Sequence, residues 1–222
     1  MTRVLVLRPE PGASSTVERA RGRGLDAFAI PLFEIEPLEW KSPDAASFDG
    51  LLITSANAIR AAGHQLKDLR GLPVYAVGGA TAEAAREAGF DVASSGDAGV
   101  ERLLGSIEAD LRLLHLCGED RKEVADAKQR IDAIPVYRSR AKDDVDLSAA
   151  QRGVAIIHSP RAGRRFAQLV GTNKEAFSIA AISDDAAAAV GDGWAAVESA
   201  DAPTDEALLA LTERLCNKAP AP

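Results

Sequence analysis

The feature that most constrains the fold of this chain is a loose internal repeat. The segments "GLLITSANAIRAA" (50–62) and "VAIIHSPRAGRRF" (154–166) each place a serine directly after a short apolar run. Two more pairs match in the same order and at nearly the same offset: 74–90 with 179–194, and 96–107 with 200–212. A period of about 104 residues is the length of a domain and not of a solenoid repeat. The 222 residues are therefore predicted to form two similar domains.

Within each repeat, short apolar runs alternate with amphipathic stretches. The apolar runs predict strands over 3–8, 26–30, 49–54, 73–77, 91–94, 112–117, 153–158, 177–182 and 195–198. The stretches between them predict helices over 15–23, 56–66, 80–88, 99–110, 120–130, 160–170, 184–191 and 204–216. Strands that are apolar nearly throughout and alternate with helices indicate parallel sheets covered on both faces. The predicted fold class is α/β.

Two segments interrupt this alternation. "PLFEIEPLE" (31–39) and "IPVYRSRA" (134–141) are short, β-prone and bounded by prolines. We interpret them as a two-stranded β linker, with linker strands over 33–39 and 135–141. One domain would then be inserted into the other. The predicted inserted domain is 40–134, and the predicted host domain is 1–32 together with 142–222.

Composition narrows the possible partners. The net charge is −7, and the sequence contains no Lys/Arg block that would neutralise a phosphate backbone, so no nucleic acid is expected as a partner. No apolar run approaches a membrane span, and the apolar stretch near the N-terminus is too short for a signal peptide, which favours the cytoplasm. Cys117 and Cys216 lie far from metal-ligand spacing, so we expect reduced thiols and no metal. The tail 217–222 is expected to be disordered.

Seven segments, in this order, resemble uroporphyrinogen-III synthases: "VLVLRPEPG", "PLFEIEP", "ITSANAIRA", "VYAVGGATAEAAREAGF", "LCGEDRKE", "IPVYRS" and "HSPRAGRRF". The resemblance implies two α/β domains joined by a two-stranded ladder, with the active site in the interdomain cleft. It also implies a lyase without cofactors that acts in porphyrin and haem biosynthesis. Such an enzyme cyclises the linear tetrapyrrole hydroxymethylbilane, with loss of water and inversion of ring D. The resemblance also implies a monomer that receives its substrate from hydroxymethylbilane synthase.

The substrate implied by this resemblance carries eight carboxylates, and helix N-termini are natural sites for anions. The turn "VGGAT" after the strand at 73–77 lacks the spacing of a phosphate loop, so we interpret it as a carboxylate cradle. Ser55, Thr81 and Ser159 are predicted to cap helices at strand ends and to donate hydroxyls to substrate carboxylates. Caps of this kind also occur without any ligand, so the capping role alone remains an alternative. Ala56, Gly78 and Gly79 complete these predicted substrate-binding turns.

Tyr137, in "PVYRS", matches the tyrosine that the family places at its cleft, and it is the predicted catalytic residue. Its phenol would help the hydroxyl of the substrate leave as water, while positioning of the bilane would supply most of the catalysis. A tyrosine that only packs between linker strands is the alternative. Further predicted carboxylate partners follow strands or begin helices: Arg8, Arg121, Lys122, Arg161 and Arg164. Gly118 is a further predicted substrate-binding position, and a solvated helix face is the alternative for the arginines. His64, His115 and His158 are assigned no catalytic role.

One turn departs from the family pattern. Where a Gly-Pro-x-Thr-Ala-like turn is usual, this chain has Ser183, Asp184 and Asp185, followed by alanine. Acids at a helix N-terminus favour the helix but repel a carboxylate. Ser183 is therefore the expected contact of this turn, unless the turn faces away from the substrate.

Two other functions remain compatible with the sequence. A two-domain binding or sensor protein could close on a small anionic ligand without turnover. A degenerate relative of the synthase could act as a regulator, which the acidic turn would suit. Turnover of the bilane, as opposed to stoichiometric stabilisation by it, distinguishes these functions from the enzyme.

Overall fold

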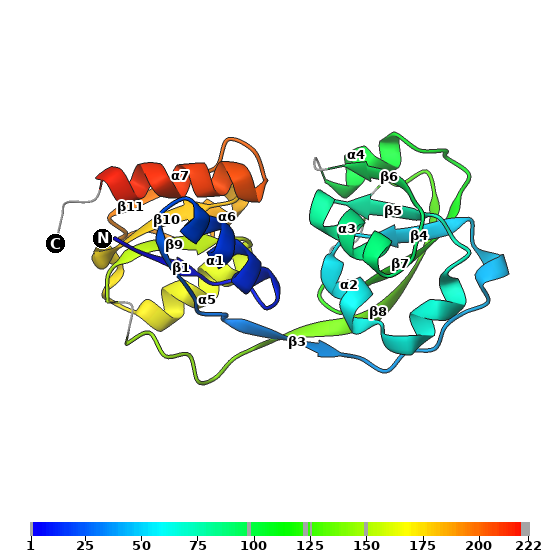
Figure 1. Cartoon of the computed structure of the whole chain (residues 1–222), viewed down its shortest axis with the longest axis horizontal. Coiled ribbons are helices and arrows are strands. Elements are labelled where there is room, and N and C mark those ends of the chain that lie inside the picture. The colour runs from blue at the N-terminus through cyan, green and yellow to red at the C-terminus, as the bar shows by residue number, and fades with distance from the viewer. Residues whose placement is uncertain (1, 97–98, 122–123, 125, 149–150, 219–222) are drawn as a thin grey trace. The chain divides into compact units, whose positions relative to one another are not determined.

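The computed structural model describes residues 2–96, 99–121, 124, 126–148 and 151–218. The chain divides into two units, which we treat separately (Figure 1). Unit 1 comprises Met1–Glu34 and Ala141–Pro222, and unit 2 comprises Ile35–Arg140. No helix in the described part of the chain is long and apolar enough to cross a membrane.

Unit 1 contains a five-stranded sheet in the order β11-β10-β9-β1-β2, and every neighbouring pair is parallel. Its strands are β1 (Arg3–Val6), β2 (Asp26–Ala29), β9 (Gly153–Ile157), β10 (Phe177–Ala181) and β11 (Ala196–Ser199). Its helices are α1 (Gly12–Gly22), α5 (Pro160–Val170), η3 (Lys174–Ala176), α6 (Asp184–Ala188) and α7 (Asp205–Lys218).

Helices cover both faces of this sheet, because every central strand is apolar on both sides. In β1, Val4 and Val6 pack with α1 and α7, whereas Leu5 packs with α5 and α6 on the opposite face. All three side chains are at most 1% exposed. This two-sided burial is the physical reason for the near-continuous apolar runs in the sequence.

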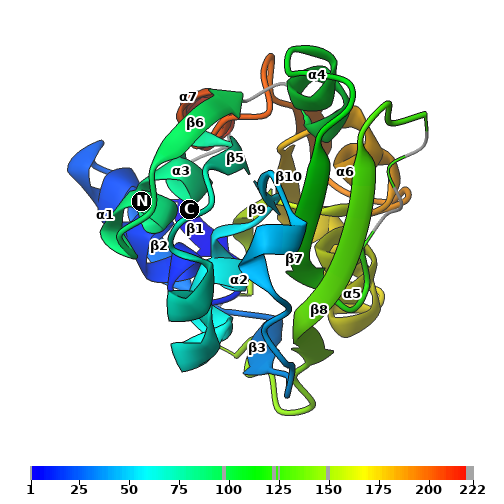
Figure 2. The same ribbon diagram turned by 90° about the vertical axis from the view of Figure 1, so that its right-hand side faces the viewer.

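Unit 2 contains a six-stranded sheet in the order β3-β8-β7-β4-β5-β6 (Figure 2). Its strands are β3 (Phe33–Pro37), β4 (Gly50–Ile53), β5 (Val74–Val77), β6 (Val92–Gly96), β7 (Arg112–Gly118) and β8 (Arg130–Ala141). Its helices are η1 (Ala45–Ser47), α2 (Ala56–Ala61), η2 (Gly63–Leu69), α3 (Gly79–Glu87) and α4 (Val100–Gly105). Residues of α2, η2 and α3 share one apolar cluster with the sheet, and leucines of α4 pack on the opposite face.

Strands β4 to β8 pair in parallel, whereas β3 runs against β8 at the sheet edge. The amide of Leu38 donates to the carbonyl of Val136 at 2.9 Å, and the amide of Lys142 donates to the carbonyl of Leu32 at 3.0 Å. Between these two bonds the residue number falls from 38 to 32 in one segment and rises from 136 to 142 in the other. The two segments therefore pair in an antiparallel way.

The two sheets share one strand order despite a different order in sequence. Strands β6-β5-β4-β7-β8 of unit 2 occupy the positions of β11-β10-β9-β1-β2 in unit 1. In unit 2 the reversal of strand order falls between β4 and β7, and in unit 1 it falls between β9 and β1. In open α/β sheets, ligands bind beyond the carboxyl ends of the strands at such a reversal. The topology therefore marks one position in each unit.

The α/β class and the parallel sheets expected from the sequence are confirmed. The helix expected over 120–130 is wrong at the described positions 124 and 126–129, while 122, 123 and 125, including Lys122, lie outside the described residues. Asp126 adopts φ 58°, which interrupts a helix, and β8 begins at Arg130 as a full member of the sheet. The tail expected to be disordered from 217 is helical to Lys218, and 219–222 lie outside the described residues.

Candidate functional site

Serine caps begin three helices where strands end. Ser55 and Ser159 are extended, and each Oγ accepts a backbone amide at 3.2 Å, from Asn57 and Ala162 respectively. Ser183 accepts the amide of Ala186 at 3.3 Å in the same way. The capping expected for Ser55 and Ser159 is confirmed. Ala56 follows as the first residue of α2. Whether these hydroxyls also contact substrate stays a prediction.

The glycine turn differs from its expected form. Gly78, with φ 88°, is the residue that precedes α3, and Gly79 is the first helical residue. Thr81 lies inside the first turn and is only 5% exposed, so the expectation that Thr81 caps this helix is wrong. A positive φ at the cap position favours glycine and leaves no side chain to cap with. The amide of Gly78 donates a hydrogen bond to the carbonyl of Gly96 at 2.9 Å.

The strand-order reversal of unit 2 brings Ser55, Gly118 and Tyr137 together. The pairing of β7 with β8 shifts by one residue, so that Cys117 faces Pro135 but Gly118 faces Tyr137. Such a bulge redirects the side chains that follow it. The phenol of Tyr137 lies against Gly118, where an added Cβ would stand 2.8 Å from its Cζ and 3.0 Å from its hydroxyl oxygen. Gly118 therefore acts by leaving room for this ring.

The surroundings of Tyr137 set the protonation state of its phenol. Partial burial raises the pKa of the Tyr137 phenol, and the bond with Ser55 offsets part of this effect. The group is therefore protonated near neutral pH and can donate a hydrogen bond. Two of the predicted site residues, Gly118 and Tyr137, thus lie against each other on neighbouring strands.

A second polar group lies beneath the same strand ends. His115 is 3% exposed, and its Nε2 lies 3.0 Å from the Oγ1 of Thr54. Burial and, to a smaller extent, the positive charge of Arg121 together lower the pKa of His115 to about 4. Burial raises the pKa of the Cys117 thiol, while Arg121 opposes this shift through its charge and a hydrogen bond. Arg121 itself is exposed. It engages these core-edge groups, whereas its expected contact with substrate stays a prediction.

The strand-order reversal of unit 1 places Arg8, after β1, beside His158, after β9. Both contact Asp205, the first residue of α7: Arg8 Nη1 donates to Oδ1 at 3.2 Å, and His158 Nε2 lies 3.0 Å from the same oxygen. The other oxygen accepts the hydroxyl of Thr16 at 2.9 Å and the guanidinium of Arg19. We refer to these five residues as the Asp205 cluster.

The electrostatics of this cluster favour an ionised acid and a neutral imidazole. Burial opposes ionisation of Asp205, but the hydrogen bonds from His158 and Arg19 and the charges around it keep its pKa well below the usual range. Burial lowers the pKa of His158, while Asp205 opposes that shift. Sequence reasoning found Arg8 but missed Asp205 and Arg19. The available signal was an acid at the start of a helix, which occurs commonly for helix stability alone.

Two other predicted residues have intramolecular contacts. The guanidinium of Arg161 lies 4.6 Å from the ring centre of Phe33, a cation–π distance. In the acidic turn, Asp184 accepts a hydrogen bond from Ser199. The carboxylate of Asp184 therefore has a hydrogen-bond partner within unit 1. Ser183 caps its helix, and its contact with substrate stays a prediction.

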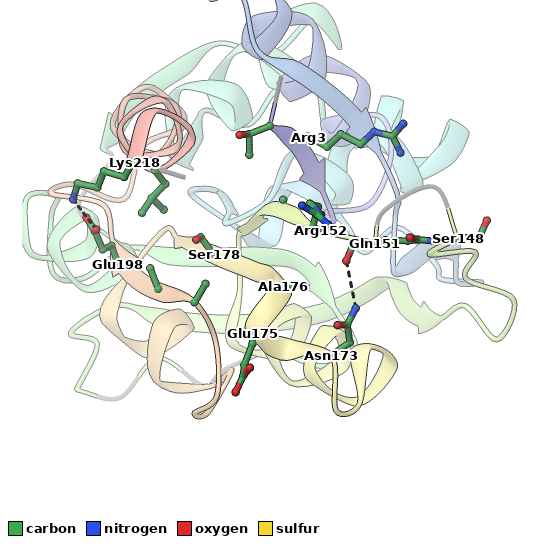
Figure 3. A pocket seen from close by; sticks show the side chains of 15 residues that line it. Arg3, Ser148, Gln151, Arg152, Asn173, Glu175, Ala176, Ser178, Glu198 and Lys218 are labelled. Carbon is green, nitrogen blue, oxygen red and sulfur yellow. Dashed lines mark hydrogen bonds and ion pairs between the residues drawn. The ribbon is translucent and has the colours of Figure 1, made fainter. Parts of the chain in front are cut away.

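A cavity of about 1290 Å³ lies elsewhere in unit 1 (Figure 3). Its lining includes Arg3, Gly153 and Ser178, which stand at the amino ends of β1, β9 and β10, together with Arg152 and Lys218. None of the predicted site residues lines it. Because parallel sheets bind ligands at the carboxyl ends of their strands, we place the candidate site at the opposite edge. Among the described residues, no group of His, Cys, Asp or Glu side chains could hold a metal ion.

Comparison with solved structures supports the same topology. A uroporphyrinogen-III synthetase from Helicobacter pylori superposes with a TM-score of 0.67 at 19% identity, over 97% of this chain and 100% of that one. A mutant uroporphyrinogen III synthase from Thermus thermophilus gives a TM-score of 0.57 at 17% identity, over 99% of this chain and 100% of that one. At these identities the likeness shows the fold. No curated protein matches the chain in sequence. Residues 14–210, however, match the family described as uroporphyrinogen-III synthase HemD, and the chain belongs to that family.

Proposed function

We propose that this protein is a uroporphyrinogen-III synthase, which cyclises hydroxymethylbilane with loss of water and inversion of ring D. The observation that carries this proposal is the family match over residues 14–210. The geometry supports it, because Tyr137, whose phenol is kept protonated by burial, lies against Gly118 at the carboxyl end of β7, a strand that flanks the strand-order reversal of unit 2.

In this mechanism Tyr137 donates a hydrogen bond to the hydroxyl of the substrate. The departing oxygen takes up a proton and the C–O bond breaks as the lone pair of the adjacent pyrrole nitrogen forms a C=N bond, so the hydroxyl leaves as water and a protonated azafulvene remains. The substituted carbon of ring D then attacks the resulting azafulvene and forms a spirocycle. Rearrangement of this spirocycle and loss of a proton give the inverted ring. The difficult step is to bring the correct carbon into contact, so positioning contributes more than acid catalysis.

The carboxylates of the substrate account for the other predicted residues. Helices α3 and α5 begin at strand ends and present backbone amides and positive dipole ends. Each helix N-terminus contributes about 0.3–1 kcal/mol toward an anion at an exposed site. The two units each supply such termini, so an acidic protein can bind a polyanion without a basic surface.

An isomer assay tests the proposal. Hydroxymethylbilane is generated with its synthase, the protein is added, and the oxidised products are separated as uroporphyrin I and III. Predominantly isomer III is expected. Isomer I alone, at the uncatalysed rate, would contradict the enzyme, and stabilisation of the protein by bilane without turnover would favour a binding protein.

The chain offers a matched control for the tyrosine, because Tyr75 and Tyr137 are its only tyrosines. Tyr137→Phe is expected to lower kcat for isomer III roughly ten- to hundredfold, a moderate loss because the elimination is intrinsically easy. Tyr75→Phe, in β5, should leave the rate unchanged. Equal rates in the two variants would show that Tyr137 only packs.

The resemblance also supports finer proposals. We propose that the protein acts as a monomer in the cytoplasm, in haem biosynthesis, and that it receives hydroxymethylbilane from its synthase. Light scattering across a range of concentrations tests the monomer. A rate of isomer III formation that depends on the ratio of the two enzymes at constant bilane flux tests the hand-over.

A further inference from the structure

The Asp205 cluster is assembled from four elements of unit 1. Asp205 begins α7, Arg8 and His158 follow β1 and β9, and Thr16 and Arg19 lie on α1. Both carboxylate oxygens of Asp205 accept two hydrogen bonds each. A carboxylate with this many charge-assisted bonds holds its donors in one geometry.

The guanidinium groups are more exposed than the carboxylate that they contact. Two guanidinium groups face one carboxylate, and His158 is neutral near neutral pH because burial lowers its pKa. The side chains of Arg8 and Arg19 are 33% and 47% exposed, whereas that of Asp205 is 21% exposed. An incoming anion therefore meets guanidinium groups before it meets the acid.

Two details show that these positions are built into the fold. The guanidinium of Arg8 lies over Gly12, where an added Cβ would stand 2.7 Å from its Nε. His158 is 8% exposed and directs Nε2 to the ionised Asp205, so Nε2 carries the proton. Its Nδ1 is then an acceptor, and it has no hydrogen-bond partner in the described part of the chain.

We propose that Asp205 is a positioning residue, which holds Arg8 and Arg19 as a subsite for one carboxylate of the substrate at the carboxyl ends of β1 and β9, while His158 fixes the carboxylate of Asp205. This inference rests on the proposed function for the identity of the ligand. The subsite lies where the strand order of unit 1 reverses, which is the position that binds ligands in open α/β sheets.

Removal of the acid separates positioning from simple charge. Asp205→Asn raises the net charge of the cluster by one, so an effect of charge alone would strengthen binding of a polyanion and lower KM. Loss of the fixed guanidinium geometry has the opposite effect. We expect KM for hydroxymethylbilane to rise roughly tenfold, with kcat changed by less than about twofold. Glu206→Gln, one residue along and exposed, removes the same charge and should leave both constants unchanged.

Gly12→Ala provides a second test that leaves every charge in place. The new methyl group displaces the guanidinium of Arg8, and alanine is a better helix residue than glycine, so the fold is retained. The same rise in KM is expected from this variant. Melting curves of all variants serve as the control that a change in KM does not result from unfolding.

Binding of the product provides a readout that does not require turnover. Quenching of tryptophan fluorescence by uroporphyrinogen III under anaerobic conditions should give a dissociation constant roughly tenfold higher for Asp205→Asn than for the wild type. A KM and a dissociation constant that fall or stay unchanged in Asp205→Asn would overturn the subsite. A wild type that binds the product but makes only isomer I would instead overturn the proposed function. In that case, the ratio of the dissociation constants of Asp205→Asn and the wild type would still decide whether the subsite exists.

Discussion

Protonation of His115 is expected to destabilise unit 2 as the pH falls. The imidazole is 3% exposed and bonded to Thr54, and burial, aided by the charge of Arg121, lowers its pKa from 6.5 to about 4. Between these two values the unfolded chain binds a proton that the folded chain does not. Stability therefore rises with pH through this window and is lost as the pH falls from about 6.5 towards 4. Between about pH 7 and about pH 4.5, this single group should remove roughly 2–3 kcal/mol from the free energy of unfolding.

The two tryptophans make it possible to follow each unit separately. Trp40 lies in the core of unit 2, where its Nε1 donates to the carbonyl of Ala62 at 2.8 Å. Trp194 stacks on Phe166 in unit 1. In a Trp194→Phe background, urea unfolding monitored by fluorescence therefore reports unit 2.

The decisive variant is His115→Gln, which can still bond Thr54 but cannot titrate. Its free energy of unfolding should depend less on pH, by the same 2–3 kcal/mol or so across the window. His64→Gln, at an exposed position, should behave as the parent does. Parallel pH profiles for His115→Gln and the parent would show that His115 titrates normally in the folded protein, and would refute the argument from burial.

Three further outcomes follow from the structure. Gly118→Ala should lower the rate of isomer III formation as much as Tyr137→Phe, because the new Cβ would stand 2.8 Å from the Tyr137 ring; an unchanged rate would refute this packing role. Ser159→Ala should cost about 1 kcal/mol in urea unfolding through loss of the α5 cap, and Ser159→Asn should restore most of it. The folded pKa of Asp205 is depressed, so its contribution is present above the ordinary carboxyl pKa of about 3.9 and is lost below it; Asp205→Asn should therefore flatten the acid limb of the stability profile of unit 1.

The sequence determined the features that depend on local chemistry and on burial. Strands that are apolar at nearly every position predicted parallel sheets in an α/β fold, because a strand that is covered on both faces has no polar face. Ser55 and Ser159 were identified as caps because a serine before an amphipathic stretch satisfies free amides wherever it occurs. The internal repeat predicted two similar α/β domains, whereas the strand order that the two sheets share became visible only in the structure. These inferences required no knowledge of distant contacts.

Only the tertiary structure decided which side chains meet. The bulge opposite Cys117 directs Tyr137 onto Gly118, and a one-residue shift in pairing is not visible in the sequence of either strand. Thr81 was expected to cap α3 because it follows a strand, but the cap position is taken by Gly78, whose positive φ favours glycine. Asp205 stands 197 residues from Arg8, and the two meet because α7 packs on the face of the sheet to which β1 contributes. The carboxyl ends of paired strands join residues that are distant along the chain, so the chemistry of this site is a property of the fold.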